Sequence, residues 1–419
     1  MAFDNNKVGG DINSYSLLKN MGYKRAPVPT DRTSVEAQNM VFNVDQNDVK
    51  MKIKVPHFEA DLFDKTPEDP LTVTDFKNMD ISVKNGLVQI SDKDLTTTVT
   101  NVLKAETKNV VRNVNIDFIP GNQIKAQIIG KKFLKFNLTV QGTAHPNPIN
   151  NVVRFTPDKI NINGIPVKKI MDFFGLEIGE MVKVGNAKGS VFTSGDSIYF
   201  APHKLVSSPK IEGNVTALKT GVGTLSVMIG NDNIDTYQPK PVYGENNYLT
   251  VRGGNVNFSG FNLLNTDLAL MDGTPENDFD IINDPSKKVI SEGQVTIPEE
   301  FIATALKQKA GSGSMKDMTF NMPNGVGKLK AKMWGFIPIS LDLNFGNSST
   351  GILKVTPGNG KVLGFVPLPN SLLRKTLVGE TQGQIDGEGV TIDLDKLADL
   401  KTGALKNVRT ENGKLILNI

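Results

Sequence analysis

The chain contains no cysteine and only three histidines among its 419 residues. The absence of cysteine excludes disulfide bonds, thiolate metal sites and thiol nucleophiles. The histidines, at positions 57, 145 and 203, do not have the spacing of a zinc motif, and His145 is predicted to lie in a turn because prolines follow it. The sequence also lacks a G-x-S-x-G elbow and a glycine loop for phosphate. We therefore expect no enzymatic activity, no catalytic residues, no metal and no cofactor.

Long apolar runs and an excess of one charge are missing as well. No stretch reaches the roughly 18–20 apolar residues that a membrane-spanning helix needs. The 47 basic residues nearly balance the 44 acidic ones, which argues against nucleic acid as a partner because its backbone requires a concentrated basic face. The polar N-terminus shows no secretory signal, so the sequence by itself predicts a cytoplasmic location.

What the sequence does contain is a long internal repeat. Leu62 and Leu268 end similar stretches 206 positions apart (268 − 62), and Leu95 and Phe301 have the same offset (301 − 95). Thr-Pro-Glu follows at 66–68 and again at 274–276, and further matches keep the same order at spacings between 200 and 208. A unit this long indicates duplicated domains rather than a solenoid of short repeats. We predict an N-terminal arm over residues 1–38, a first module over 39–230, a linker over 231–246 and a second module over 247–419.

Strand patterns dominate both modules. Lysine alternates with apolar residues over 50–55, which predicts a strand whose lysines face water. A lysine row that binds a membrane or an acid is the less favoured interpretation. The same period of two recurs over 133–140, 328–333 and 339–345, as expected for antiparallel strands with one wet face.

Two helices are expected in each module. The first spans about 92–103, with Ser91 or Asp92 as its cap, and its counterpart spans about 298–306, with Pro298 at the first helical position. The second helix is expected after Pro166 and again after Pro369, ending at a glycine in both copies, Gly175 and Gly379.

This order of elements resembles the bacterial LmeA-like phospholipid-binding family, which is related to the tubular lipid-binding (TULIP) superfamily. The likeness is carried by Gln-Ile-Ser-Asp-Lys-Asp-Leu over 89–95, Val-Asn-Ile-Asp-Phe over 114–118, Lys-Phe-Asn-Leu-Thr-Val over 135–140, Arg-Phe-Thr-Pro over 154–157 and Ile-Asn-Gly-Ile-Pro over 162–166. It implies an α+β fold of two tandem TULIP-like modules, each a long curved antiparallel sheet wrapped around an amphipathic helix. It also implies a cell-envelope or periplasmic location, although the chain lacks the signal and cysteines of secreted members.

The resemblance further implies an apolar groove for acyl chains in each module. Periodicity selects aliphatic and aromatic residues as its lining. For each residue taken alone, ordinary core is the favoured interpretation, because the apolar face of a sheet must be buried with or without lipid. Lysines 131 and 132 could stand at the mouth of the first groove. The lining candidates are Leu95, Val99, Leu134, Phe136, Leu138, Ile170, Phe173 and Phe174 in the first module and Phe301, Leu306, Trp334, Ile339, Leu341, Leu372 and Leu377 in the second.

Two functions follow as hypotheses. The first is binding, and transfer, of a phospholipid or another long-chain or fatty-acyl amphiphile, with transient contact to a membrane surface. The alternative is a non-enzymatic structural or protein-interaction protein whose modules have fully packed cores. The sequence leaves a hydrolase on the same scaffold as a third and more distant interpretation, which the scarcity of histidine disfavours.

Overall fold

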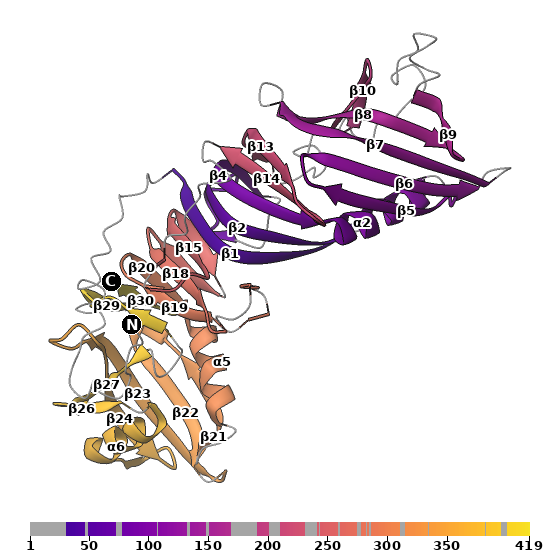
Figure 1. Cartoon of the computed structure of the whole chain (residues 1–419). Helices are drawn as coiled ribbons and strands as arrows, with labels where there is room; N and C mark the ends of the chain where they lie inside the picture. The colour runs from indigo at the N-terminus through magenta and orange to yellow at the C-terminus, as the bar shows by residue number, and fades with distance from the viewer. Residues whose placement is uncertain are drawn as a thin grey trace.

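The computed structural model describes residues 31–46, 49–72, 78–106, 108–131, 135–147, 151–168, 191–200, 210–230, 241–242, 244–258, 260–274, 278–281, 283–284, 286–310, 315–333, 335–381, 383–394 and 400–419. It is mostly β-sheet with few helices, which confirms a β-rich, α+β-like fold. Figure 1 shows an elongated and bent molecule, with the two halves of the chain at opposite ends and a sheet common to both between them.

The central sheet takes strands from both halves of the chain. Strands β1 and β15 pair antiparallel, with Val35 opposite Val251, and this ladder joins the halves. The strand order is β13-β14-β4-β2-β1-β15-β18-β19-β28, and β12 pairs with β4 outside this path. The bounds are β1 Thr33–Gln46, β2 Val49–Asp64, β4 Met79–Ser91, β12 Lys210–Glu212, β13 Val215–Thr220, β14 Thr224–Gly230, β15 Tyr248–Gly253, β18 Asp267–Asp272, β19 Ser286–Ile290 and β28 Leu400–Thr402.

The outer end of the first half is a second sheet that follows helix α2 (Asp92–Glu106). Its order is β10-β11-β8-β7-β6-β5, with β9 paired to β8. Most of it is a meander of neighbouring antiparallel strands, so its register is set locally by short turns. The bounds are β5 Val111–Ile119, β6 Gln123–Lys131, β7 Lys135–Asn147, β8 Val152–Ile162, β9 Ile165–Pro166, β10 Val191–Ser194 and β11 Ser197–Phe200.

The outer end of the second half repeats this arrangement strand for strand. Helix α5 (Glu299–Ala310) leads into a sheet of order β21-β22-β23-β24-β27-β26, with β25 paired to β24 and helix α6 (Asn370–Thr381) packed against it. The bounds are β21 Met315–Asn321, β22 Gly327–Met333, β23 Ile337–Asn347, β24 Leu353–Val362, β25 Val366–Pro367, β26 Gln384–Asp386 and β27 Gly389–Ile392.

A six-stranded sheet, which has no separate counterpart among the described residues of the first half, lies between these two parts in the second half. Its order is β29-β30-β20-β17-β16-β3, and the short helix η3 (Pro323–Gly325) contacts β29. Strand β3 belongs to the first half of the chain and pairs parallel with β16, so the halves are hydrogen-bonded at a second place. The bounds are β3 Leu71–Thr72, β16 Asn255–Phe258, β17 Phe261–Leu264, β20 Gln294–Pro298, β29 Asn407–Glu411 and β30 Lys414–Asn418.

The extra sheet arises because long strands of the first half correspond to two shorter ones in the second. The interruptions fall at Gly254, Asn265 and Gly293, whose φ angles are +64°, +48° and +113°. Such angles end a strand and suit glycine and asparagine. A Cβ at Gly293 would lie 2.5 Å from the Thr266 Cα, so a larger residue cannot occupy this corner without a backbone shift.

The local predictions have mixed outcomes. Helix α2 begins at Asp92 with Ser91 as its cap, since the Asp94 amide donates to the Ser91 Oγ at 3.0 Å. Pro298 is the last residue of β20, not the first residue of α5, and α6 runs past Gly379 to Thr381. His145 lies in β7 rather than in a turn, and Pro146 is tolerated there because β7 pairs with β6 only up to Thr143. Beyond residue 168, the helix expected after Pro166 falls on residues that lie outside the described ranges.

The threonines that begin the two Thr-Pro-Glu segments have a common local geometry. Asp64 ends β2, and its Oδ1 accepts hydrogen bonds from the Thr66 amide at 2.8 Å and hydroxyl at 3.1 Å. Asp272 ends β18 and accepts from Thr274 in the same way, at 2.7 Å and 3.0 Å. These Asx-type turns satisfy backbone amides where each strand stops.

The largest hydrophobic core lies in the second half of the chain and extends under the central sheet. First-half residues Val35 and Leu62 belong to it together with Val251 and Leu268. Val242, in the segment predicted as a linker, is buried with Tyr248 in a smaller cluster. Packing therefore crosses the boundary between the predicted modules, and the module limits themselves remain a prediction.

Candidate functional site

Helix α2 covers the open edge of the first outer sheet. The edge strand β5 leaves backbone amides unpaired on its free side, and two threonines one helical turn apart accept from them. Thr96 Oγ1 accepts from the Ile116 amide at 2.9 Å, and Thr100 Oγ1 accepts from the Val114 amide at 3.3 Å. The helix is thereby fixed along the strand, and its apolar side is held beside the sheet.

The groove candidates Leu95 and Val99 lie on this apolar side. They pack against a small cluster that contains Val114 and Phe118, together with Ile128 of β6. Both side chains are half-buried rather than enclosed. The sequence pattern therefore placed these two residues beside the sheet, as expected for a helix with one apolar stripe.

The neighbouring strands β6 and β7 continue the same apolar face. Cross-strand pairs Ile128–Leu138 and Ala126–Val140 place these side chains on one surface, and all four are half-buried. Phe136 is opposite Gly130, and a Cβ at Gly130 would lie 2.3 Å from the Phe136 ring. The ring thus covers the position that the missing side chain of Gly130 leaves open.

The corresponding face of the second half is closed by its own side chains. Ile339 and Leu341 are 7% and 6% exposed and belong to the main core, and their strand partners Ala331 and Leu329 are buried too. Leu306 of α5 and Leu377 of α6 pack against this core. A lipid site at these residues stays a prediction, because in this structure they contact protein.

Two further candidates of the second half lie toward solvent. Phe301 of α5 packs against Phe261 with 4.2 Å between ring centroids and a tilt of 55° between the rings, yet 37% of Phe301 stays exposed. Leu372 of α6 is exposed. The remaining candidates lie outside the described residues, and they are Leu134, Ile170, Phe173, Phe174 and Trp334. At the suggested mouth of the first groove, Lys131 is exposed and Lys132 lies outside the described residues.

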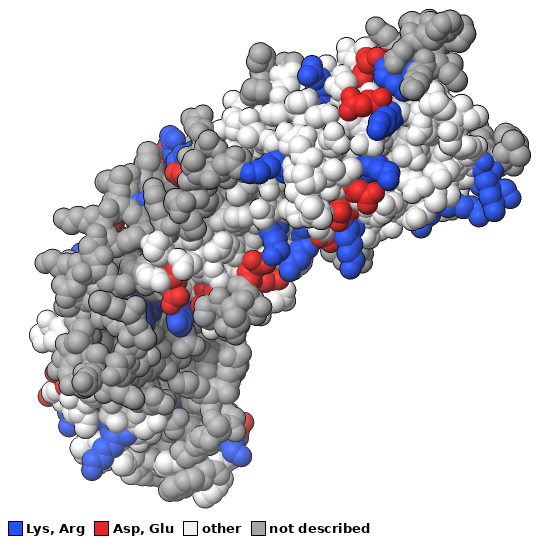
Figure 2. Space-filling view, viewed as in Figure 1, with Lys and Arg blue, Asp and Glu red and all other residues white. Residues whose placement is uncertain are grey.

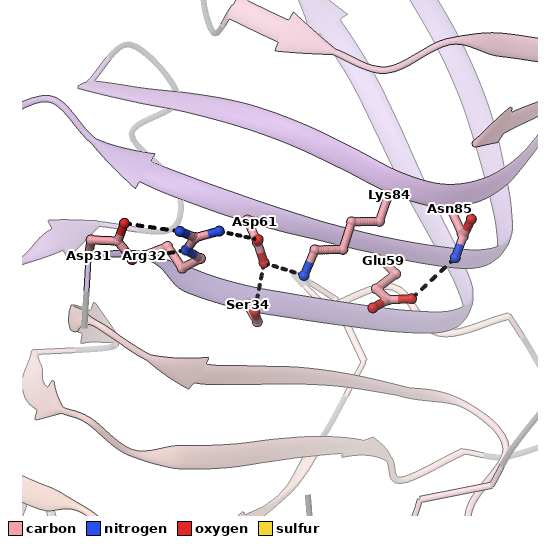
Figure 3. A network of polar contacts seen from close by, with 7 residues as sticks. All are labelled: Asp31, Arg32, Ser34, Glu59, Asp61, Lys84 and Asn85. Carbon is pink, nitrogen blue, oxygen red and sulfur yellow. Dashed lines mark hydrogen bonds and ion pairs between the residues drawn. The ribbon is translucent and has the colours of Figure 1, made fainter. Parts of the chain in front are cut away.

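A buried carboxylate on the central sheet forms a polar site that the sequence analysis missed. The Asp61 side chain is only 5% exposed, and its oxygens lie 2.7 Å from Lys84 Nζ and 3.3 Å from Arg32 Nη1. Ser34 Oγ donates to it at 2.7 Å, and Arg32 also binds Asp31 (Figure 3). Nearby, Asn85 Nδ2 lies 3.5 Å from Glu59 Oε2.

These partners decide the charge of Asp61. Burial alone would raise the pKa of the Asp61 carboxyl, but the hydrogen bonds from Lys84 and Ser34 and the nearby Arg32 hold its pKa below the ordinary value. The carboxylate is therefore ionised at neutral pH and its charge is compensated. A buried carboxylate with compensated charge occurs in structural ion-pair networks at least as readily as in catalytic sites.

The aspartate of this site recurs in the second half, again with a basic partner. Asp61 and Asp267 are 206 positions apart (267 − 61), the spacing of the repeat. In the central sheet Asp61 pairs with Ser34, Ser34 with Arg252, and Arg252 with Asp267, so one polar row crosses the junction between the halves. Arg252 Nε lies 3.6 Å from Asp267 Oδ2. The aspartate shared by both copies was the sequence signal that could have identified this row.

The described part of the chain contains neither a metal cluster nor a membrane-spanning helix. No group of three acidic or histidine side chains in this part of the chain is close enough together to hold a metal ion. None of the helices in the described ranges has the length and apolar character needed to cross a bilayer.

Comparisons with known proteins give only weak likenesses. No family model matches the chain, and no curated protein matches it. Among solved structures it is similar to P47 from Clostridium botulinum A2, at 11% identity over 94% of this chain and 99% of that chain, with a TM-score of 0.13. It is also similar to lipopolysaccharide binding protein, at 9% identity over 93% and 98%, with a TM-score of 0.13. Likenesses at these TM-scores carry no argument about fold or function, and the resemblance to the LmeA-like family stays a prediction.

Proposed function

We propose that the chain binds a phospholipid or another long-chain amphiphile on the apolar face that α2 and strands β5–β8 share. The observation that supports this is the contrast between two equivalent faces. Ile128, Leu138 and Val140 are only half-buried in the first half, whereas Ile339 and Leu341 are enclosed in the second. On this proposal each module is the TULIP-like unit that the resemblance implies, with its sheet curved around the helix.

The physical basis is the hydrophobic effect. Each CH₂ group transferred from water to an apolar surface gains about 0.8 kcal/mol. A row of half-buried aliphatic side chains also retains surface that a ligand can still remove from water, unlike a closed core. An acyl chain lying along this face would need few polar contacts, which agrees with the lack of a sharp sequence motif. Non-covalent binding of this kind requires no catalytic residue.

The second half supports a different candidate. Its closed core, with Leu329, Ala331 and Leu341 all buried, fits the alternative of a packed structural or protein-interaction module. The two proposals are compatible if the first half carries the ligand and the second half does not. The lipid-binding proposal predicts bound lipid on the chain, whereas packed modules throughout would carry none.

The test is direct identification of what the chain carries. The purified full chain is extracted with organic solvent before and after incubation with phospholipid vesicles, and the extract is analysed by mass spectrometry. Near-stoichiometric phospholipid supports the proposal. A blank in both extracts rejects it and favours the packed-module alternative.

A pair of variants on β7 localises the site. Phe136→Asp places a charge on the half-buried face and is expected to abolish lipid retention, because an ionised carboxylate is strongly disfavoured beside acyl chains. Asn137→Asp is the matched control on the exposed side of the same strand, where the side chain accepts from Gln127. If both folded variants carry lipid at the wild-type level, the site has been assigned to the wrong face.

A further inference from the structure

Two neighbouring turns form an apolar tip at the outer end of the second half. One joins β22 to β23 and carries Phe336, and the other joins β24 to β25 and carries Leu363 and Phe365. The turns are adjacent because Ile339 pairs with Val362 and the Leu363 amide donates to the Pro338 carbonyl at 2.9 Å. Phe336, Leu363 and Phe365 are 71%, 54% and 74% exposed. We call these three residues the apolar tip.

The equivalent turn of the first half shows what the fold by itself requires. There Ile162 pairs with Ile165, so two residues, Asn163 and Gly164, make the turn, both with positive φ. Asn-Gly is the favoured pair for such a turn. In the second half Val362 pairs with Val366, so the turn is one residue longer and reads Leu363, Gly364, Phe365.

Leu363 is unfavourable for folding in two ways. Its φ of +55° lies in the left-handed region, which is costly for a bulky side chain and easy for asparagine. It also leaves most of its apolar side chain in water. A strained and exposed apolar residue of this kind contributes little to folding, so its location points to a role in binding.

Lysines lie on the adjacent outward face of the sheet. Lys316 is paired directly opposite Lys332, and Ser340 pairs with both Lys330 and Lys361. All four lysines are exposed. Asp317 offsets part of this charge by binding Lys332 at 2.8 Å. Like charges opposite each other on a sheet repel, and an anionic surface would relieve that repulsion.

We infer that the apolar tip of the second half docks on an anionic lipid membrane, with Phe336, Leu363 and Phe365 entering the interface and the lysines facing the headgroups. A lipid interface is deformable and can accommodate separate protruding turns beside a basic face. The preformed pocket of a protein partner fits such turns less well. The inference goes beyond lipid carriage, because it concerns the opposite end of the molecule from the half-buried face. Basic side chains also gather where β6 and β7 meet in the first half (Figure 2), but that turn lies outside the described residues.

The test is flotation of the full chain with two kinds of vesicle. One kind is phosphatidylcholine alone, and the other is equal parts of phosphatidylcholine and phosphatidylglycerol. The wild-type chain is expected to float with the anionic vesicles and to be partly released by added salt, because salt screens the lysines. If it floats with neither kind, the inference is wrong and a protein partner becomes the better explanation of the apolar tip.

Three variants assign the binding to the tip. The double variant Phe336→Ser, Phe365→Ser is expected to bind anionic vesicles at least roughly tenfold more weakly, since it removes two large apolar side chains from the interface. Leu363→Asn restores the residue of the first-half turn, so it should bind several-fold more weakly while resisting urea at least as well as the wild type. Val222→Ser is the control, because Val222 is an 88% exposed apolar residue on the separate β13–β14 turn.

The three variants together test whether the chain binds vesicles through the apolar tip. Loss of vesicle binding in the tip variants, with Val222→Ser unchanged, supports docking through the apolar tip. Wild-type binding by the tip variants would overturn it, and so would an equal loss in Val222→Ser. Where Leu363→Asn resists urea at least as well as the wild type, its loss of binding is not caused by misfolding.

Discussion

The Asp61 carboxylate lies 2.7 Å from the Lys84 ammonium, and the two residues come from adjacent strands of the central sheet. Asp61 is buried while Lys84 is 44% exposed, so the pair links the interior of the sheet to solvent. Arg32 and Ser34 complete the shell around the carboxylate. The carboxylate therefore links β1, β2 and β4 on the first-half side of the central sheet.

Replacing that charge should weaken the fold. Asp61→Asn is expected to lower the free energy of unfolding by about 1–2 kcal/mol, which is less than for a fully buried pair because both cations are partly exposed. Urea denaturation of the full chain measures the change. Asp31→Asn is the control, since it alters an exposed carboxylate on the same arginine and should leave the free energy of unfolding nearly unchanged. Equal effects in the two variants would contradict the role given to Asp61.

The same carboxylate predicts a pH dependence. Its folded-state pKa is lowered, so its stabilising contribution is present above the unfolded-state pKa of about 3.9 and is lost as the pH falls through the lower folded-state value. The difference in unfolding free energy between wild type and Asp61→Asn should therefore be full at pH 7 and shrink below about pH 4. A difference that stays constant down to about pH 2 would show that Asp61 has an ordinary pKa in the folded chain.

Apolar substitutions in the two outer sheets should differ in their effect on the free energy of unfolding. Leu341→Ala removes an enclosed side chain and is expected to cost about 2–5 kcal/mol, because it leaves a cavity in the main core. Phe136→Ala removes a half-buried ring that already borders solvent, and we expect a cost below about 2 kcal/mol. Thermal and urea unfolding of both variants provide the comparison. A larger loss for Phe136→Ala would mean that the first face is as tightly packed as the second.

Cutting the chain between the halves should not yield two stable proteins. Residues 247–419 expressed alone would expose Val251 and Leu268, because Val35 and Leu62 of the first half help to bury them. We expect this fragment to aggregate, and to become soluble when residues 1–246 are co-expressed with it. Size-exclusion chromatography of each preparation is the measurement. A monodisperse, cooperatively unfolding 247–419 fragment would show that the shared core is dispensable.

Much of the local structure could be predicted from the sequence. The repeat offset follows from the likeness of the two halves. The alternation of Lys328, Lys330 and Lys332 with buried Leu329 and Ala331, and the Ser91 cap, follow from short-range periodicity and hydrogen bonding. Strand periodicity did not predict how deeply Ile339 and Phe136 are buried. Both alternate correctly along their strands, yet one is enclosed and the other half-buried, since burial depends on which side chains arrive from elsewhere.

The sequence by itself determined that the chain is duplicated, β-rich and free of cysteine chemistry, because these properties depend on composition and on patterns within a few residues. Only the tertiary structure decided that the halves share one sheet and one core, that Asp61 and Asp267 lie in one polar row, and that Leu363 and Phe365 lie on one tip with Phe336. These relationships depend on strand pairings between residues far apart in the chain, such as Ser34 with Arg252. Periodicity specifies which face of a strand is apolar, but the partner that covers that face is chosen by the packing of the whole molecule.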